Sequence, residues 1–227
     1  MSTFYLPASD IPSTVRSELD PWVAGFVGLD TEQAGQRLRE RWSAIQRPSL
    51  IGLRDTLLEF EVEGIAKIHS GFAIKAYRDG ADDPGIGDYW YLAGPMEREE
   101  IARRLIPFGL EGNEALADFL FFFGGLAEDT ETAGHFVSEA YDWRAFDHTG
   151  LPDINLQATQ GFEEWKGALM LYHARNGCHI LVRRDGSVGW WVMQERKVAT
   201  AAEDFDAFVR IFDEHRQISW PFDPYGP

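Results

Sequence analysis

Three local patterns in the sequence predict an α+β fold, with an antiparallel sheet and helices packed on it. The first is the alternation of Phe60 and Val62 with glutamates, which is typical of a half-buried strand. The second is the Asp185-Gly186 pair between two β-rich runs, a strong signal for an antiparallel hairpin. The third is a C-terminal segment, residues 200–216, whose apolar residues recur with the spacing of a helix.

The N-terminal half is predicted to contain a helix followed by a three-stranded antiparallel meander. The helix begins at a capping pair, Asp30 with Gln33, and Pro48 is expected to end it. Its buried face is expected to consist of Ala34, Leu38, Trp42 and Ile45. The three strands are expected at residues 58–64, 71–80 and 89–94.

Two further helices are predicted in the middle of the chain. Residues 96–105 carry acids early and arginines late, as the helix macrodipole favours. Residues 113–123 form the second helix, with Asn113 as its N-cap and Gly124 in the left-handed position beyond its last turn. The apolar run Phe119–Phe123 is therefore expected in the core. The acids that follow it are expected on an exposed loop.

The C-terminal part is predicted to be a hairpin and a closing helix. The hairpin places Trp190 and Trp191 on opposite faces of its second strand, one of them in the core and the other exposed. Thr200 and Glu203 are expected to form a capping box for the closing helix. The core face of that helix is expected to consist of Phe205, Phe208, Val209 and Phe212.

Composition is typical of a folded globular protein. The chain has 227 residues and is 44% hydrophobic, which is enough to bury a sizeable core. The N-terminus lacks the basic start and apolar block of a signal peptide, and no apolar run approaches the roughly 20 residues that a membrane helix needs. The single cysteine, Cys178, has no internal disulfide partner, which favours a reducing, cytoplasmic compartment.

The charge restricts the class of partner. With 37 acids against 21 Lys and Arg, the formal net charge is −16, which argues against nucleic acids and anionic membranes as ligands. No Lys or Arg occurs between Leu105 and Trp143, a span that carries Glu111 and Glu114 among other acids. A surface of one sign produces a directional field and favours a basic protein partner. Acidity that only keeps the chain soluble explains the same composition.

The sequence contains no motif for catalysis or metal binding. Its six histidines are not spaced as metal ligands, and it has neither a glycine-rich phosphate loop nor the nucleophile motif of hydrolases. Cys178 lies in a predicted strand and is expected to be buried. We therefore expect no catalytic residue, no metal and no cofactor, and a candidate site made of acids that bind a protein partner. The candidate residues are Asp82, Asp83, Asp88, Glu128, Asp129, Glu131, Glu139 and Asp142.

The C-terminal part of the chain resembles the SUKH superfamily, the group that includes the Smi/Knr-like proteins. The segment EALADFLFFFGGL is similar to that family's helix with a glycine-rich turn, and GHFVSEAYDW is similar to the strand and Trp that follow. The segment HILVRRDGSVGWWVMQERKVATAAEDFDAFVRIF resembles the family's hairpin and Phe-rich closing helix. The resemblance covers about residues 97–216. Residues 1–96 are then a helical and strand extension packed on a SUKH-like core, residues 97–227, within one compact unit.

The resemblance implies an α+β fold with one antiparallel sheet and a role without catalysis. Many bacterial members are immunity proteins that bind and neutralise a polymorphic toxin inside the cell that makes it, so the implied partner is a basic toxin domain. Other members are regulatory scaffolds, and an adaptor of the same fold is the first alternative. An enzyme with an acidic pocket, acting on a small cationic substrate or a sugar, is the second alternative.

Overall fold

The structure, a computed structural model, consists of one antiparallel sheet with helices packed on it. It describes residues 4–5, 11–68, 71–79, 87–128, 134–137, 143–149, 155–174 and 177–218 of the 227-residue chain. Within these residues ten strands form a single sheet in sequential order from β1 to β10. Each strand pairs with the next in the antiparallel sense. The predicted α+β class is confirmed.

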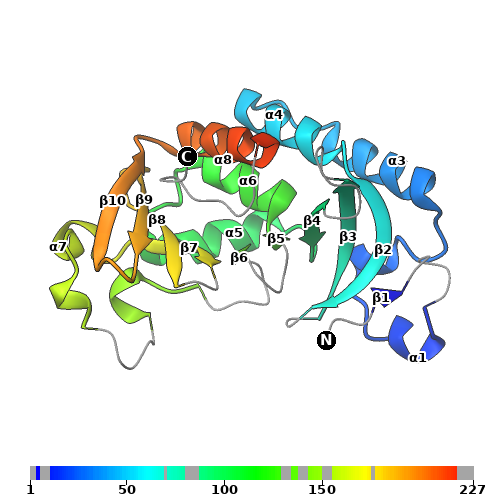
Figure 1. The fold of residues 1–227 in the computed structure, drawn as a ribbon, viewed down its shortest axis with the longest axis horizontal. Coiled ribbons are helices and arrows are strands. Elements are labelled where there is room, and N and C mark those ends of the chain that lie inside the picture. The colour runs from blue at the N-terminus through cyan, green and yellow to red at the C-terminus, as the bar shows by residue number, and fades with distance from the viewer. Residues whose placement is uncertain are drawn as a thin grey trace.

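The strands differ greatly in length: β5 and β6 in the middle of the sheet have three residues each, and the edge strand β1 has two. Figure 1 shows the longer strands as two groups at the ends of the long axis, joined through the short central strands. The strands are β1 (Phe4–Tyr5), β2 (Glu61–Ile68), β3 (Gly71–Asp79), β4 (Gly87–Leu92), β5 (Leu126–Glu128), β6 (Gly134–Phe136), β7 (Leu169–Ala174), β8 (Cys178–Val182), β9 (Val188–Val192) and β10 (Lys197–Ala202).

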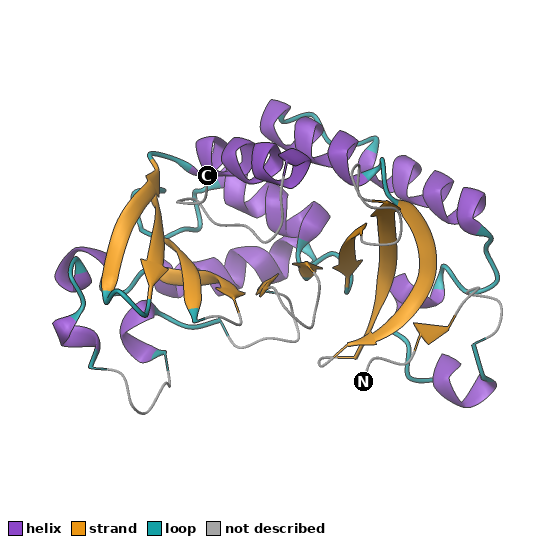
Figure 2. Ribbon diagram, viewed as in Figure 1, coloured by secondary structure: helices purple, strands orange, loops and turns teal. Residues whose placement is uncertain are grey.

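Most helices lie along one face of the sheet, as Figure 2 shows in purple. The α-helices are α1 (Ser13–Arg16), α2 (Pro21–Ala24), α3 (Thr31–Trp42), α4 (Pro48–Leu57), α5 (Arg98–Leu105), α6 (Glu114–Phe123), α7 (Phe162–Trp165) and α8 (Phe205–Ile218). Three short 3-10 helices are η2 (Ile106–Phe108), η3 (Phe146–His148) and η4 (Leu156–Ala158). We call the side on which α3, α4, α5, α6 and α8 pack the helix-covered face, and the other side the opposite face. No described helix has the length and apolar composition required to cross a membrane.

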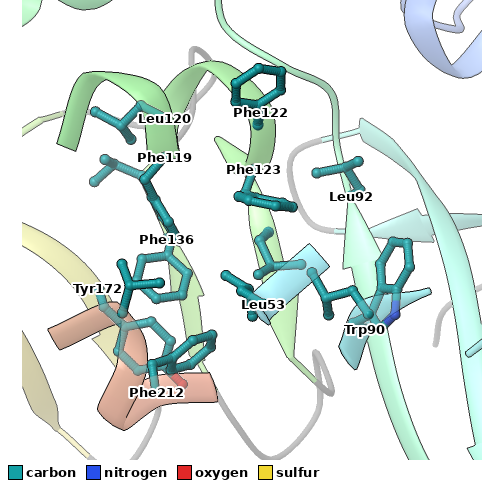
Figure 3. Packing of buried hydrophobic residues seen from close by; sticks show 14 of the residues in the cluster. Leu53, Trp90, Leu92, Phe119, Leu120, Phe122, Phe123, Phe136, Tyr172 and Phe212 are labelled. Atoms are coloured by element: carbon teal, nitrogen blue, oxygen red, sulfur yellow. The ribbon is translucent and has the colours of Figure 1, made fainter. Parts of the chain in front are cut away.

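The main hydrophobic core lies between the helix-covered face and these helices. In Figure 3, Phe119 of α6 points at Phe136 of β6, and their ring centroids are 4.9 Å apart. Phe136 also meets Phe212 of α8 edge-on at 5.2 Å. Trp42 of α3 and Phe123 of α6 approach to 5.2 Å. Each fully buried side chain of this size stabilises the fold by roughly 1.5–3 kcal/mol, so these aromatic contacts hold three helices on the sheet.

Several local predictions are confirmed. Asp30 accepts a hydrogen bond of 2.8 Å from the Gln33 backbone N–H, and Gln33 Oε1 accepts one of 3.1 Å from the Asp30 N–H. Asn113 caps α6 through the Leu116 N–H at 3.0 Å. Strands β2, β3 and β4 form the expected meander, and β8 and β9 form the expected hairpin. The expected core residues of the closing helix are all buried.

The prediction that Pro48 ends the first long helix is wrong. Helix α3 stops at Trp42, and Pro48 is the first residue of α4. Proline is tolerated at that position because the first N–H groups of a helix have no intrahelical acceptor. A proline can therefore either end a helix or begin one, and the sequence pattern did not show which of the two applies to Pro48.

Two predicted details, one at the glycine turn and one at the closing helix, are also wrong. The left-handed residue after α6 is Gly125 (φ 79°), whereas Gly124 has φ −54°. Helix α8 is capped by Asp204, which accepts from the Ala207 N–H at 2.7 Å, because Thr200 belongs to the additional strand β10.

Trp190 and Trp191 do point to opposite faces, but neither is exposed: they are 2% and 0% accessible. A second hydrophobic cluster on the opposite face covers Trp191, with Phe146 and Phe162 among its members. Phe146 begins η3 and Phe162 begins α7, so both come from short helices outside the hairpin.

The expected division at residue 96 falls between β4 and α5. Strand β4 pairs with β5 across that division, with Trp90 opposite Glu128 and Leu92 opposite Leu126. One hydrophobic core includes Trp42 from the first part of the chain and Phe123 from the second. In the described residues, the two ranges therefore share both a sheet and a core.

Candidate protein-binding site

Only two of the predicted partner-binding acids lie in the described part of the chain. These are Asp88 on β4 and Glu128 on β5. The remaining candidates lie outside the described residues: Asp82, Asp83, Asp129, Glu131, Glu139 and Asp142. The structure therefore locates two of the candidates, and for the others the sequence prediction stands by itself.

The expectation that Glu128 lies on an exposed rim is wrong. Its exposed fraction is 0%, and its Oε2 accepts a hydrogen bond of 2.7 Å from the Tyr172 hydroxyl. The cause is the pairing of β5: the alternation of side chains along the strand points Glu128 to the same face as Leu126, into the main core. Glu128 is thus part of the interior and is removed from the candidate surface.

Asp88 is half-buried and already neutralised. Its carboxylate lies 3.1 Å from the guanidinium of Arg78, and its side chain is 29% exposed. Arg78 also pairs with Glu59 at 2.9 Å and lies over the ring of Phe60. This cluster holds the ends of β3 and β4 together, and Asp88 contributes little unpaired charge to the surface.

A groove on another part of the surface collects several acids from distant segments. It has a volume of about 480 Å³ and lies where the start of α6, the β8–β9 turn and the start of α8 meet. Its lining residues are Arg47, Gly109, Leu110, Gly112, Asn113, Glu114, Ala115, Arg184, Asp185, Gly186, Asp204, Phe205 and Asp206.

The carboxylates at the groove differ in how strongly the protein neutralises them. The side chain of Glu114 is 90% exposed and its closest ion pair, to Arg47, is a long 3.9 Å. Asp204 is exposed, as is Glu111, which lies between two lining residues. Asp185 is bound by Arg183 at 2.7 Å and by Ser187 at 2.6 Å, and these hydrogen bonds lower its pKa to about 2. Asp185 is therefore held as a carboxylate by its own chain, whereas Glu111, Glu114 and Asp204 are exposed at the groove.

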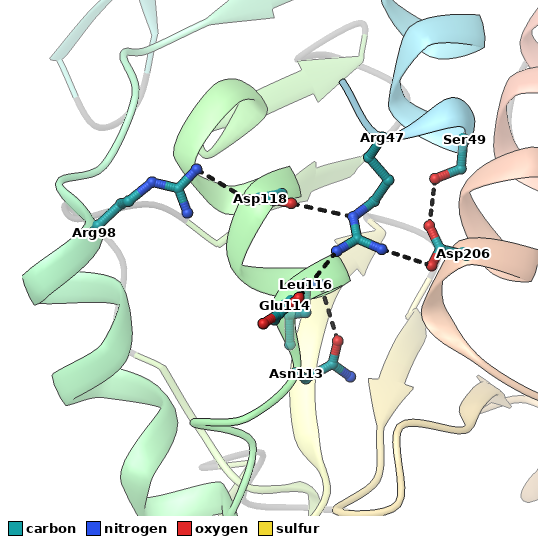
Figure 4. Close-up of polar contacts among 8 residues, drawn as sticks. All are labelled: Arg47, Ser49, Arg98, Asn113, Glu114, Leu116, Asp118 and Asp206. Carbon is teal, nitrogen blue, oxygen red and sulfur yellow. Dashed lines mark hydrogen bonds and ion pairs between the residues drawn. The ribbon is translucent and has the colours of Figure 1, made fainter. Parts of the chain in front are cut away.

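Arg47 fixes the wall of the groove by joining three helices (Figure 4). Its guanidinium lies 3.1 Å from Asp118 of α6 and 3.0 Å from Asp206 of α8, while its own backbone precedes α4. Ser49 donates a further hydrogen bond of 2.5 Å to Asp206. Burial lowers the pKa of Arg47, but the hydrogen bonds and charges of Asp118 and Asp206 outweigh this and raise it. The arginine is thus a structural cation that is occupied by its own chain.

An exposed apolar side chain precedes the groove lining in the sequence. Among the described residues, Ile106 is the only large hydrophobic residue that is exposed, with 61% of its surface accessible. It begins η2, three residues before Gly109 of the groove lining. An exposed apolar side chain next to charged groups has the composition of a protein interface, with an apolar centre and a polar rim.

The chemistry available at this groove is that of binding. Its exposed carboxylates can accept hydrogen bonds and ion pairs from Lys or Arg side chains of another protein. No group of three or more His, Cys, Asp or Glu in the described segments is arranged to hold a metal ion. Cys178, which we expected to be buried, is 6% exposed and lies on the sheet away from the groove lining.

The sequence indicated part of this groove and missed the rest. Glu111 and Glu114 belong to the span without Lys or Arg, but nothing local distinguishes them from the acids that follow α6. Asp185 and Asp204 reach the groove only because the β8–β9 turn and the start of α8 fold back onto α6. The sequence does contain a signal at Ile106. It directly precedes Pro107, and the residue before a proline usually marks the end of a helix.

Comparison with protein-family models, curated proteins and solved structures found no match to this chain.

Proposed function

We propose that the protein is an immunity protein of the SUKH type, which binds and neutralises a basic toxin domain through an acidic surface that includes the groove between α6, the β8–β9 turn and α8. The observation that carries the proposal is the excess of acids around this groove. Its described lining contains four acids, Glu114, Asp185, Asp204 and Asp206, and two arginines, Arg47 and Arg184. Glu111, Glu114 and Asp204 are exposed there, and Arg47 is occupied by Asp118 and Asp206. The resemblance of residues 97–216 to the family supports the same function.

The groove suits a partner that must be captured rapidly and held tightly. Opposite charges raise the association rate by steering the encounter, and they suppress binding of acidic competitors. The exposed side chain of Ile106 supplies apolar area that carries affinity once the partner is seated. A carboxylate-lined groove that covers a cationic active site also excludes the toxin's own polyanionic substrate.

The first experiment is affinity capture with the tagged chain from its source cells at low and high salt, with mass spectrometry of the bound proteins. The captured protein is then expressed alone and together with this chain. A basic protein that is toxic alone and harmless in the presence of this chain is the expected result. A captured protein that has an ordinary cellular role and no toxicity contradicts the immunity function and favours the adaptor alternative.

The second experiment tests the groove with that partner. The variant Glu111→Gln, Glu114→Gln and Asp204→Asn removes three charges, and Asn at position 204 still caps α8. We expect its association rate with the captured partner to fall at least about tenfold at low salt and to lose most of its salt dependence. The control, Glu32→Gln with Glu40→Gln and Glu163→Gln, removes the same charge from exposed positions elsewhere. Equal losses in both variants would show that net charge, not the groove, governs binding.

A further inference from the structure

A row of aromatic side chains crosses four strands on the opposite face of the sheet. His135 of β6 lies directly opposite His173 of β7, His173 opposite His179 of β8, and His179 opposite Trp191 of β9. The ring centroids are separated by 5.5, 5.3 and 5.1 Å along the row. We call these four residues the histidine row. Cross-strand neighbours at these distances act as one packed unit.

Half of the row is buried in a way that does not suit a charged imidazole: His179 and Trp191 are buried, whereas His135 and His173 are half-buried. His179 is 7% exposed, and its Nδ1 is buried without a hydrogen-bond partner in the structure. Trp191, against which it stacks, is fully buried and meets Phe146 edge-on at 4.9 Å. The surroundings at this end of the row are therefore apolar. A proton added to His179 would lie in them without water to solvate it.

The charged groups that face the row also oppose protonation. His173 faces His135 from β6, His179 from β8 and Arg144 from the segment before η3, and each of these carries positive charge when ionised. Burial, followed by these neighbours, lowers the pKa of His173 to about 3. Burial lowers the pKa of His179 to about 4; a hydrogen bond involving the Tyr172 backbone raises it, and His135 lowers it further. Both imidazoles are therefore neutral at the pH of the cytoplasm.

The row also lies where the described strands in the interior of the sheet are shortest. Within the described residues, β6 has three residues and meets β5 through one residue pair, Ala127 with His135, and through a backbone hydrogen bond of 3.3 Å from the Gly125 N–H to the Val137 carbonyl. The longer strands on either side have extensive ladders of their own. Segments with few pairings open at a lower free energy than the rest of a protein.

We propose that the histidine row is an acid-sensitive switch: protonation of His173 and His179 separates β6, β7 and β8 while the meander β2–β4 and the helices on it stay folded. The direction follows from proton linkage. In the opened segment the histidines bind protons at the ordinary histidine pKa of about 6.5, whereas in the closed segment they stay neutral at that pH. Lowering the pH from about 6.5 to 4 therefore favours the opened segment. Above about pH 6.5 the row does not make the stability depend on pH. This switch is independent of the function proposed above.

The test uses Cys178, the only cysteine of the chain, as a reporter of β8 opening. It neighbours His179 and is 6% exposed, so a thiol reagent reaches it only when β8 separates. Labelling by 4,4′-dithiodipyridine is measured at pH 7 and pH 5 on the full chain, each rate divided by that of the urea-unfolded chain at the same pH. Between pH 7 and pH 5, protonation of one imidazole is expected to raise the opened population on the order of 20-fold. Protonation of both imidazoles is then expected to lower the protection of Cys178 against labelling several hundred-fold.

The variant His173→Phe with His179→Phe keeps aromatic rings in the row and removes the titrating groups. We expect the protection of its Cys178 to change less than about threefold between pH 7 and pH 5. The control is His148→Gln, because the His148 side chain is 80% exposed and lies outside the row; it is expected to behave as the parent protein does. The same loss of protection in the parent and the double variant overturns the proposal.

A second measurement serves if the double variant does not fold. The six histidines of the unchanged protein are titrated by NMR through their imidazole protons. The switch requires two imidazoles that stay neutral down to pH 5 in the closed form. If all six titrate with midpoints near 6.5, the row does not resist protonation and the proposal fails.

Discussion

The Tyr172 hydroxyl donates a hydrogen bond of 2.7 Å to Glu128, and this carboxyl group lies fully inside the protein. Tyr172 itself packs edge-on against Phe136 at 4.9 Å. The pair joins β5 to β7 across the short strand β6, where the described residues of β5 and β6 form one residue pair. A polar contact in the core thus supplements this short ladder.

Removing the Tyr172 hydroxyl is expected to destabilise the protein. In Tyr172→Phe, the buried Glu128 carboxyl loses a donor, and the free energy of unfolding should fall by about 1–3 kcal/mol. Glu128→Gln should cost less, because an amide oxygen still accepts from the hydroxyl. The measurement is urea unfolding at pH 7. The control is Tyr77→Phe, since the Tyr77 hydroxyl contacts Asp79 on the surface and its loss should change little. Equal effects of Tyr172→Phe and Tyr77→Phe would contradict the buried role of the pair.

Features that depend on a few neighbouring residues were predicted well from the sequence. The Asp30–Gln33 capping box is such a feature, because both of its hydrogen bonds lie within three residues. The β8–β9 hairpin is another, since the Asp185-Gly186 turn and its flanking strands determine it locally. The core face of α8 follows from helical spacing for the same reason.

Features that depend on distant segments were not predicted. Trp191 is buried because Phe146 and Phe162, from segments that gave no regular pattern, fold under the sheet. Asp204, not Thr200, caps α8, because an additional edge strand, β10, extends the β8–β9 hairpin and contains Thr200. Neither relationship leaves a local pattern in the sequence.

The candidate surface was predicted as a set of eight acids, and the two of them that the structure describes, Asp88 and Glu128, do not line the groove. The excess of acids predicts a basic partner, since charge is a property of composition. Whether a given acid is exposed depends on its strand register, and this placed Glu128 in the core. The groove itself forms only when the start of α6 meets Asp185 and Asp204, which are far away in the sequence.

Arg47→Lys is expected to loosen the junction of α4, α6 and α8. The planar guanidinium contacts Asp118 and Asp206 at once, and a lysine ammonium cannot reproduce this fork. The free energy of unfolding should fall by about 1–2 kcal/mol in urea titration at low salt. The control is Arg103→Lys on α5, whose side chain is 69% exposed and pairs with Glu100; its effect should stay below about 0.5 kcal/mol. If the two variants are equally stable, the Arg47 junction contributes no more than a surface ion pair.

The two glycines after α6 are expected to tolerate alanine differently, for different reasons. Gly125 has φ 79°, so Gly125→Ala places a side chain in the left-handed region and should cost about 1 kcal/mol. A Cβ on Gly124 would lie 2.3 Å from the Leu120 carbonyl oxygen, so Gly124→Ala forces the backbone to move and should cost about 3 kcal/mol. Thermal unfolding measures both. Gly112→Ala is the control, because a Cβ there meets nothing within 4 Å. The order of the two losses is the critical result, and a larger loss for Gly125→Ala would contradict the geometry.

Asp185→Asn is expected to weaken the β8–β9 turn only where the carboxylate is ionised. The hydrogen bond from Arg183, followed by that from Ser187, lowers the pKa of Asp185 to about 2. A lowered carboxyl pKa stabilises the folded state above the unfolded value of about 3.9, and this contribution disappears as the pH falls through 2. The side chain is 58% exposed, so solvent screening limits the loss at pH 7 to about 1 kcal/mol or less.

The measurement for Asp185 is the difference in unfolding free energy between Asp185→Asn and the parent protein at pH 7, 4 and 2. The difference should be constant from pH 7 to about 5 and shrink between pH 4 and pH 2, because the protonated acid and the amide then make similar contacts. Asp55→Asn is the matched control: Asp55 is 60% exposed and pairs with Arg54 on the surface of α4. A difference at position 185 that stays the same at every pH would mean that the turn depends on the shape of the side chain and not on its charge.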